Sequence, residues 1–247
     1  MNRVENYGTQ LQMYALYKTI LNLGYDCRIV DYDRGVALSS SAIKYLIKNI
    51  ISRGGLAKKN RAFQKVSNLC KYTETLKKND LFRLNEELDC AICGSDQIWN
   101  PEFTGLDSAN YLDFMEKNKR VTYAASIGLN CNNVNIPEQI LSNIREINKV
   151  SVREKDLNDN LIKLGINSTH VLDPTLLFSS GDWDAILSNN VKRKKNCYKK
   201  YLLKYGFQGD DEKNINEICT TIAKKNDLEL IDILPKYSLV RNKQIQK

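Results

Sequence analysis

The chain has 247 residues, 42% of them hydrophobic and 27% charged, which is the composition of an ordinary soluble globular protein. Its length suits one large domain or two small ones, and no apolar stretch is long enough to cross a bilayer as a helix. A formal net charge of +8 favours anionic partners such as phosphates, acidic sugars, nucleic acid or an anionic membrane face, without choosing among them.

The seven cysteines are odd in number and scattered, and the polar start of the sequence predicts no signal peptide. This usage favours reduced thiols in a cytoplasmic protein. Cys90 and Cys93 form a single C-x-x-C pair within an apolar run, whereas a zinc site usually needs a second pair or histidines. We therefore expect these two residues to pack in a core, and we expect no metal site. The cysteines are Cys27, Cys70, Cys90, Cys93, Cys131, Cys197 and Cys219.

The first predicted elements are a helix over residues 9–23 and a strand from Tyr25 to Tyr32. Apolar side chains recur at helical spacing from Met13 to Ile20. Gly24 stands where a glycine commonly ends a helix. A helix followed directly by a strand indicates α/β alternation.

Residues 44–78 form the most basic block of the chain, with ten Lys or Arg against one acid, Glu74. Helical spacing from Ile43 to Ile50 predicts a helix at its start. The block is either a solvated helical face or a surface that attracts an anionic membrane or an anionic substrate. It lacks interleaved aromatic residues and any nucleic-acid-binding signature, so we expect no nucleic-acid partner.

Beyond the basic block, short predicted strands alternate with predicted helices. This succession predicts an α/β fold, with a parallel sheet covered by helices on both faces. The predicted strands are residues 88–94, 120–128, 149–153 and one that ends at Asp173-Pro174, and the predicted helices are residues 138–148 and a segment from Leu157 to Leu164 closed by Gly165.

A polar, basic segment after residue 180 is typical of a linker. A strand in residues 198–207, a helix marked by Ile215 to Ile222 and a strand in residues 228–234 follow it. One βαβ unit is too small to bury a core alone, so the second domain would be incomplete. The predicted parts are a first domain over residues 1–180, a linker over 181–197 and the start of a second domain over 198–247.

The segment CAICGSDQIWNPEF places polar residues directly after an apolar run. Ligands of open parallel sheets bind beyond the carboxyl ends of the strands. Gly94 would permit a tight turn and the close approach of a ligand. Ser95 and Asp96, followed by Gln97, would either cap a helix or hydrogen-bond a sugar or phosphate.

Three further strand ends carry polar groups. Small residues around Ser126 leave room for a ligand. Arg153, at a helix entrance, would hold a carboxylate or phosphate through two hydrogen bonds, or it would form a surface pair with Glu154 or Asp156. Asp173 ends a predicted strand and precedes a proline. Its carboxylate would either belong to the site or only stabilise the turn.

Asn6, Tyr7 and Gly8 precede the first helix, whose exposed N–H groups suit an anion, and helix capping by Asn6 or Thr9 is the alternative. His170, the one histidine, lies inside a predicted strand, where a structural role is favoured. The chain has no GxGxxG, GxxxxGK[ST] or GxSxG motif. This argues against the common dinucleotide-binding, P-loop and serine-hydrolase classes.

Taken together, these motifs resemble the polysaccharide pyruvyl transferase family. The combination of GSDQ-x-W-N-P with SVRE and LDPT is specific, whereas any one of them alone is a weak signal. In family order from Asn6 to Trp183, the matching segments are NYGTQLQMYALYK, GYDCRIVDYD, CGSDQIWNP, VTYAASIG, VSVREKDLNDNLIKLGI and VLDPTLLF, followed by DW.

The resemblance implies two Rossmann-like domains, arranged similarly to those of GT-B glycosyltransferases. It implies transfer of the enolpyruvyl unit of phosphoenolpyruvate (PEP) to sugar hydroxyls of a cell-surface glycan, which forms a pyruvate ketal and releases phosphate without a metal or cofactor. An acid would protonate the PEP methylene, and a base would take the proton of the attacking hydroxyl. Arg153 matches a PEP-binding arginine, and the strand-end and first-loop motifs match segments that line the cleft. We add Ser126 and Asp173 to the substrate-binding residues.

The resemblance also implies two segments that this chain lacks. They are a first β-strand before the NYG motif and a later S-x-H-G segment whose histidine serves PEP, a position that His170 does not match. We therefore expect a chain truncated at both ends, with unassigned catalytic residues and no activity by itself. The alternative is an inactive fragment, or a module that binds anions or glycans. The expected partners are PEP, a sugar or lipid-linked glycan acceptor, and an anionic membrane contacted peripherally from the cytoplasm.

Overall fold

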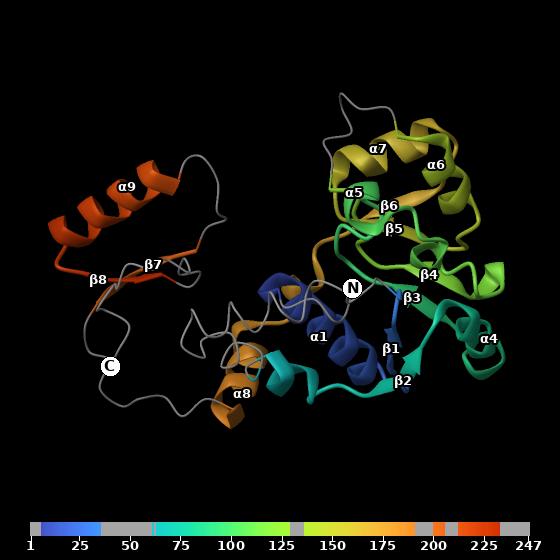
Figure 1. Cartoon of the computed structure of the whole chain (residues 1–247), viewed down its shortest axis with the longest axis horizontal. Helices are drawn as coiled ribbons and strands as arrows, with labels where there is room; N and C mark the ends of the chain where they lie inside the picture. The colour runs from blue at the N-terminus through green and yellow to red at the C-terminus, as the bar shows by residue number, and fades with distance from the viewer. Residues whose placement is uncertain are drawn as a thin grey trace. The chain divides into compact units, whose positions relative to one another are not determined.

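The computed structural model describes residues 6–35, 61, 63–128, 136–190, 200–205 and 212–232. The helix predicted from Ile43 to Ile50 and the thiols of Cys131 and Cys197 lie outside these residues. The described part is a mixed α/β structure whose strands pair in parallel, as predicted (Figure 1). Its residues fall into two units, one up to Trp183 and one from Asp184 onward.

Helix α1 extends from Tyr7 to Asn22, close to the predicted residues 9–23. The Asn6 side chain caps its start by accepting a hydrogen bond from the Thr9 N–H at 3.2 Å. The chain leaves the helix at Gly24, whose φ of +92° is a conformation that side chains with a Cβ rarely adopt. The predicted end of this helix is therefore confirmed.

Strand β1 (Ile29–Tyr32) pairs in parallel with strand β2 (Tyr72–Leu76). Strand β2 was not predicted, because its residues belong to the basic block over 44–78, for which a solvated helical face was one of two interpretations. A tyrosine and two threonines favour the extended conformation, and Thr75 Oγ1 donates to a carboxylate oxygen of Asp31 across the pair at 2.7 Å. The helical interpretation of the block is therefore wrong at β2.

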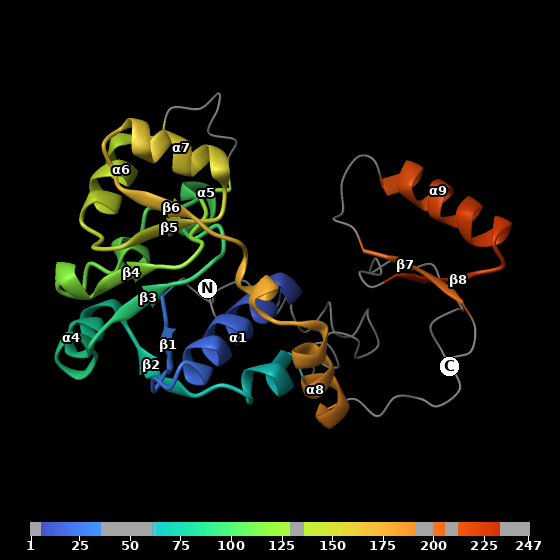
Figure 2. The ribbon, with the colours of Figure 1, turned by 180° about the vertical axis from the view of Figure 1, so that it is seen from behind.

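Four further strands of the first unit lie side by side: β3 (Ala91–Cys93), β4 (Arg120–Thr122), β5 (Val150–Val152) and β6 (Ser168–His170). β3 pairs with β4 and β5 with β6, and single parallel bridges, Val121–Lys149 and Ala125–Val152, join β4 to β5. The carboxyl ends of the four strands therefore share one edge, which can be followed in Figure 2.

The strand predicted over residues 120–128 stops early, at Thr122. Ala124 has a φ of +52°, which regular strand backbone does not allow. After this turn, the Ala125 N–H donates to the carbonyl of Ser151, and the Ala125 carbonyl accepts from the N–H of Arg153, both at 3.1 Å. The chain after β4 is thereby carried along the end of β5.

Helices α6 (Glu138–Arg145) and α7 (Lys155–Lys163) confirm the two helices predicted in this region. Their apolar residues bury the main core against β5. Leu164 was predicted on the same stripe, but it follows the end of α7 and is 48% exposed. The wholly buried members of this core are Trp99, Ala125, Ile127, Ile140, Ile144, Val152, Leu157 and Leu161.

Short helical segments connect the strands: η1 (Lys78–Arg83), α4 (Leu84–Glu87), α5 (Pro101–Thr104), η2 (Ser108–Tyr111), η3 (Lys117–Lys119) and η4 (Pro174–Leu177). A second core lies around β2, β3 and η1 and contains Cys93. Burial raises the pKa of the Cys93 thiol to about 12, whereas Cys90 is exposed. The prediction of core packing is therefore correct for Cys93 and wrong for Cys90.

The second unit contains strands β7 (Tyr201–Lys204) and β8 (Glu229–Asp232), which pair in parallel, and helix α9 (Glu212–Lys225) packs against both. This confirms the predicted βαβ unit. Helix α8 (Ser180–Asn190) contains the boundary between the units, so the segment predicted as a linker begins as a helix.

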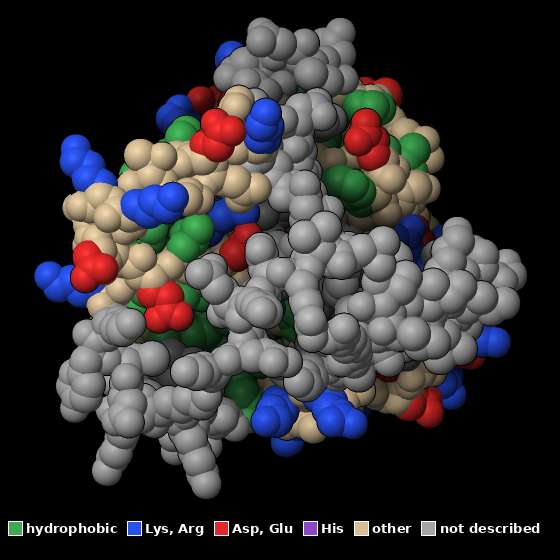
Figure 3. Space-filling model, turned by 60° about the vertical axis from the view of Figure 1, so that its left-hand side comes forward, with side chains coloured by type: hydrophobic (Ala, Val, Ile, Leu, Met, Phe, Trp, Pro, Cys, Tyr) green, Lys and Arg blue, Asp and Glu red, His purple; other side chains and the backbone are tan. Residues whose placement is uncertain are grey.

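None of the described helices is long and apolar enough to cross a membrane. Figure 3 shows Lys and Arg side chains lying among Asp and Glu side chains over the described part of one face. In the described part of the basic block, Lys71 lies 3.8 Å from a carboxylate oxygen of Asp26, and Lys78 lies 3.3 Å from one of Asp107. These two bases therefore have acidic neighbours on their own surface.

Candidate functional site

The carboxyl ends of β3 to β6 bring four of the predicted polar residues, Ser95, Ser126, Arg153 and Asp173, into one hydrogen-bonded network. Arg153, directly after β5, is at its centre. Its Nη1 lies 3.3 Å from Oδ2 of Asp173, its Nη2 donates to Oγ of Ser126 at 3.1 Å, and its Nε lies 3.3 Å from Oε1 of Glu154. The predicted pair with Glu154 is therefore present, but it is one of three contacts made by residues from three different strand ends.

Asp173 accepts hydrogen bonds on both carboxylate oxygens. Ser95 Oγ and Arg153 reach Oδ2, at 3.1 and 3.3 Å. The N–H and Oγ1 of Thr175 reach Oδ1, at 3.0 and 2.8 Å. The hydrogen bonds from Thr175 are the turn contacts that we considered for Asp173. Asp173 makes them together with its contacts to Ser95 and Arg153 on other strand ends. Burial raises the pKa of Asp173, but the hydrogen bonds from Thr175, Ser95 and Arg153 outweigh it and hold the pKa below its usual value.

The lowered pKa of Asp173 predicts a loss of stability in acid. A carboxylate whose pKa is lower in the folded than in the unfolded chain stabilises the fold above the unfolded pKa, and this contribution disappears as the pH falls through the folded pKa. Asp173→Asn should therefore lose less stability than the wild type when the pH is lowered from about 6 to about 3. Urea unfolding midpoints at the two pH values measure this difference. If the wild type and Asp173→Asn lost the same stability between the two pH values, the hydrogen bonds assigned to Asp173 would be contradicted.

The start of α1 is joined to the strand ends through Thr9, whose Oγ1 donates to Oδ2 of Asp96 at 2.9 Å. The predicted residues Asn6, Tyr7 and Gly8 are exposed, and none of them has a hydrogen bond to the Arg153 network among those described. Asn6 caps the helix, which is the alternative we had left open. Their role in substrate binding stays a prediction.

Gly94 was predicted to permit a tight turn and the close approach of a ligand, which stays a prediction, and the structure shows a packing reason for the glycine as well. A Cβ on Gly94 would approach Cδ2 of Leu16 to 3.3 Å. The missing side chain therefore allows close packing of α1 against the end of β3. Gln97 turns toward Gly128, and its Oε1 accepts a hydrogen bond from Nδ2 of Asn100 at 3.0 Å.

Gly128 completes the network, because its N–H donates to Oγ of Ser126 at 3.1 Å. It has a φ of +68°, and a Cβ there would overlap the amide of Gln97. Gly105 has a similar φ of +58° with nothing near its Cβ position. The two glycines are therefore a matched pair, with the same backbone requirement and different surroundings.

We expect Gly105→Ala to cost about 1–2 kcal/mol in the free energy of unfolding, because an L-residue is strained at positive φ. Gly128→Ala should cost about 1 kcal/mol more, because Gln97 must move and lose its hydrogen bond. Urea unfolding followed by circular dichroism measures both. Equal costs would mean that the contact between Gly128 and Gln97 contributes nothing.

Glu154 is the site residue that the sequence analysis missed, since we treated it there only as a surface partner of Arg153. Its Oε1 accepts a hydrogen bond from Oγ of the buried Ser126 at 2.5 Å. Its Oε2 is buried without a hydrogen-bond partner among the described residues. The SVRE segment used for the family resemblance contains Glu154 and was the available signal.

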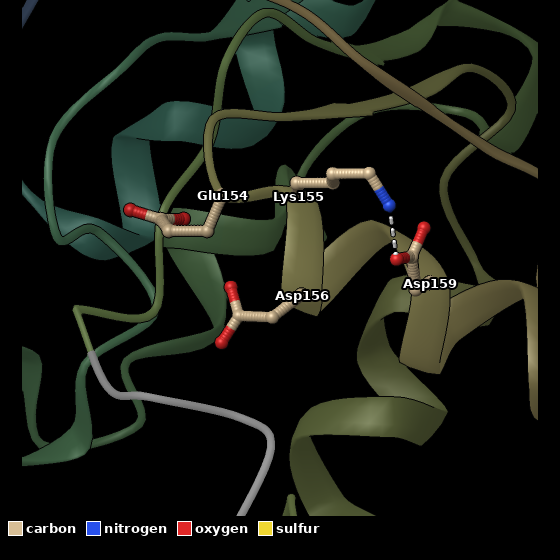
Figure 4. A pocket seen from close by; sticks show the side chains of 4 residues that line it. All are labelled: Glu154, Lys155, Asp156 and Asp159. Carbon is tan, nitrogen blue, oxygen red and sulfur yellow. Dashed lines mark hydrogen bonds and ion pairs between the residues drawn. The ribbon is translucent and has the colours of Figure 1, made fainter.

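An open pocket of ≈ 570 Å³ lies beside the network, lined by Glu154, Lys155, Asp156 and Asp159 (Figure 4). Lys155 Nζ lies 2.6 Å from Oδ2 of Asp159, one helical turn along α7. In Figure 4 the Glu154 side chain points away from this pair. Among the described residues, no three His, Cys, Asp or Glu side chains are grouped so that they could hold a metal ion.

His170 lies on the outside of the network. Its Nε2 contacts the carbonyl oxygen of Arg153 at 3.1 Å, and its side chain is exposed. This contact supports the backbone of Arg153 rather than its guanidinium, which agrees with the structural role that we expected.

An α/β unit with charged and hydroxyl groups at the carboxyl ends of parallel strands is typical of proteins that bind small polar ligands at that edge. Residues 6–245 match the model of the family described as polysaccharide pyruvyl transferase, so the chain belongs to this family. No curated protein and no solved structure gives a significant match. The resemblance drawn from the motifs is confirmed, and the expectation of missing family segments at both ends stays a prediction.

Proposed function

We propose that this protein transfers the pyruvyl unit of PEP to a glycan. The PEP methylene takes up a proton, one sugar hydroxyl adds to the neighbouring carbon, and a second hydroxyl displaces phosphate to close the ketal. Family membership supports the transfer of a pyruvyl unit to a polysaccharide. The observation that carries the proposal is the network around Arg153, which combines a cation for the donor with carboxylates for sugar hydroxyls.

Arg153 is the group that we propose for the anionic donor. A guanidinium has five N–H donors, and contacts to Ser126, Glu154 and Asp173 engage one on each nitrogen. Two N–H groups remain for a ligand, which suits a single carboxylate or phosphate face. The proposal keeps the residues predicted from the sequence: Asn6, Tyr7, Gly8, Gly94, Ser95, Asp96, Gln97, Ser126, Arg153 and Asp173. Ser95 and Ser126 are fully buried, so their part would be to hold Asp173 and Arg153 rather than to touch a ligand.

The two aspartates at the strand ends would serve different purposes. The pKa of Asp173 is lowered, so this residue is a weak base that remains ionised and holds Arg153. Asp96 receives hydrogen bonds from Thr9 and from the N–H of Gln97. Carboxylates of this kind bind sugar hydroxyls, which supports a place for the acceptor beside Asp96.

We further propose a Rossmann-like first unit, a GT-B-like arrangement with the second unit, and residence in the cytoplasm. Parallel strands with connecting helices support the first, and family membership is the ground for proposing the second. The basic block over residues 44–78 supports peripheral contact with an anionic membrane that carries a lipid-linked acceptor.

The proposal is tested by incubating the purified chain with PEP and a panel of glycan acceptors. Phosphate release measures donor consumption, and the methyl signal of the ketal in proton NMR spectra identifies the product. Pyruvate with phosphate replaces PEP in the control. Acceptor-dependent phosphate release with PEP, and none in the control, would support the proposal and overturn the expectation that the chain is inactive by itself. A chain that binds neither PEP nor acceptor would overturn the proposal.

Glycan binding without turnover is the second candidate function. Three carboxylates, from Asp96, Glu154 and Asp173, accompany the single guanidinium of Arg153, so the cluster as a whole favours hydroxyl donors over anions. The same incubation separates the two functions. Acceptor binding that is saturable without PEP, with no phosphate released, would favour this second candidate.

A further inference from the structure

The hydroxyl proton of Ser126 has one direction available to it. Ser126 is fully buried, and its Oγ has three partners within hydrogen-bond distance. Two of them, the N–H of Gly128 and Nη2 of Arg153, can only donate. The hydroxyl must therefore donate its own proton to the third partner, Oε1 of Glu154.

This assignment makes Glu154 the acceptor at the end of a short chain of hydrogen bonds. Its Oε1 receives the Ser126 hydroxyl and also lies 3.3 Å from Nε of Arg153. Glu154 thus holds Arg153 twice, directly at Nε and through Ser126 at Nη2. Asp173 holds the remaining nitrogen, Nη1. A planar group held at all three nitrogens has a fixed plane.

The position of Glu154 is itself fixed by packing. It stands at the N-cap position of α7, whose Leu157 and Leu161 are wholly buried in the main core. Packing of the helix therefore fixes where the backbone of Glu154 lies, and the contacts with Ser126 and Arg153 hold its carboxylate.

We propose that Glu154 is a positioning residue that sets the plane of the Arg153 guanidinium through Ser126, so that the two remaining N–H groups face the anion of the donor. This inference rests on the proposed function. The negative charge of Glu154 does not explain why this residue lies beside Arg153, because a second anion there weakens the attraction of Arg153 for an anionic ligand. Orientation is the property that Glu154 supplies.

The sign of one mutational effect tests this proposal. If Glu154 acts only through its charge, Glu154→Ala and Glu154→Gln should both tighten PEP binding. If it positions Arg153, Glu154→Ala should weaken PEP binding by about tenfold or more, because two charge-assisted contacts are lost. Glu154→Gln keeps an acceptor oxygen and should stay within about threefold of the wild type. Tighter PEP binding by Glu154→Ala, measured by calorimetry, would overturn the proposal.

A second measurement needs no ligand. The ¹⁵N relaxation of the Arg153 Nε–H group reports how firmly the guanidinium is held. Its order parameter should fall in Ser126→Ala and fall further in Glu154→Ala, which also loses the direct contact at Nε. The double variant should be no worse than Glu154→Ala, because the contact through Ser126 depends on Glu154. Asp159→Ala is the control, since it removes an exposed carboxylate on the same helix that pairs with Lys155 rather than with Arg153.

The two readouts separate failure of this inference from failure of the proposed function. A wild-type chain that binds no PEP would contradict the proposed function, and the relaxation of Arg153 would still decide the role of Glu154. An Arg153 Nε–H group that is equally ordered in the wild type and in Glu154→Ala would overturn the inference, whatever the affinity for PEP.

Discussion

Replacing Trp99 with alanine is expected to lower the free energy of unfolding by about 3–5 kcal/mol, the range for removing a large aromatic side chain from a core. Trp99 has no exposed surface. Its ring stacks on that of Tyr111, with centroids 5.8 Å apart and planes within 3°. The backbone N–H of Trp99 also donates to the carbonyl of Ser126 at 3.1 Å, so the cavity would lie directly beneath the candidate site.

Phe103 offers a matched control for Trp99, because it lies four residues further along the same segment and is 61% exposed. Phe103→Ala should change the free energy of unfolding by no more than about 0.5 kcal/mol. Urea unfolding of the whole chain, followed by circular dichroism, measures both variants. If the two variants unfold at similar urea concentrations, Trp99 is not the anchor that its burial indicates.

Replacing Arg153 with alanine is the substitution with the largest expected effect on ligand binding. The change removes the one guanidinium of the network and leaves Asp173 and Glu154 as neighbouring half-buried anions. Loss of a charged hydrogen-bond donor costs roughly 1.5–3 kcal/mol, so affinity for PEP should fall by about 10- to 100-fold. Calorimetric titration of the purified chain with PEP measures the change.

Two variants make the Arg153 experiment specific. Arg153→Lys keeps the charge but loses the planar fork, so it should recover only part of the affinity. Arg145→Ala removes an arginine that pairs with Glu138 on the exposed surface of α6, and it should bind PEP as the wild type does. Unchanged affinity in Arg153→Ala would remove Arg153 from the donor site.

Much of the site could be located from single strand ends. Gly94 and Pro174 interrupt apolar runs, and Ser126 and Arg153 stand at the ends of predicted strands, so each position carried its own local signal. Strand β2 could not be found in this way. Its few residues lie among lysines, and the partner strand β1 that stabilises it is about forty residues away in the sequence.

The contacts between the site residues were not predictable from local patterns. Ser126 reaches Glu154 only because Ala124 adopts a positive φ and turns the chain along the end of β5. Alanine rarely takes this conformation, so the sequence carries no sign of the turn. For Arg153 the sequence offered either a surface pair with a neighbouring acid or a ligand site. The structure adds Ser126 and Asp173, from other strand ends, to its partners.

The sequence by itself determined the family, the α/β succession and the polar residues at the strand ends. These features are encoded in neighbouring residues, through hydrophobic periodicity, turn residues and short motifs. Only the tertiary structure decided which of those residues meet, and it made Glu154 a partner of Ser126 and Arg153. Hydrogen bonds require distances near 3 Å, and those distances depend on how strand register and the packing of α6 and α7 bring separate strand ends together.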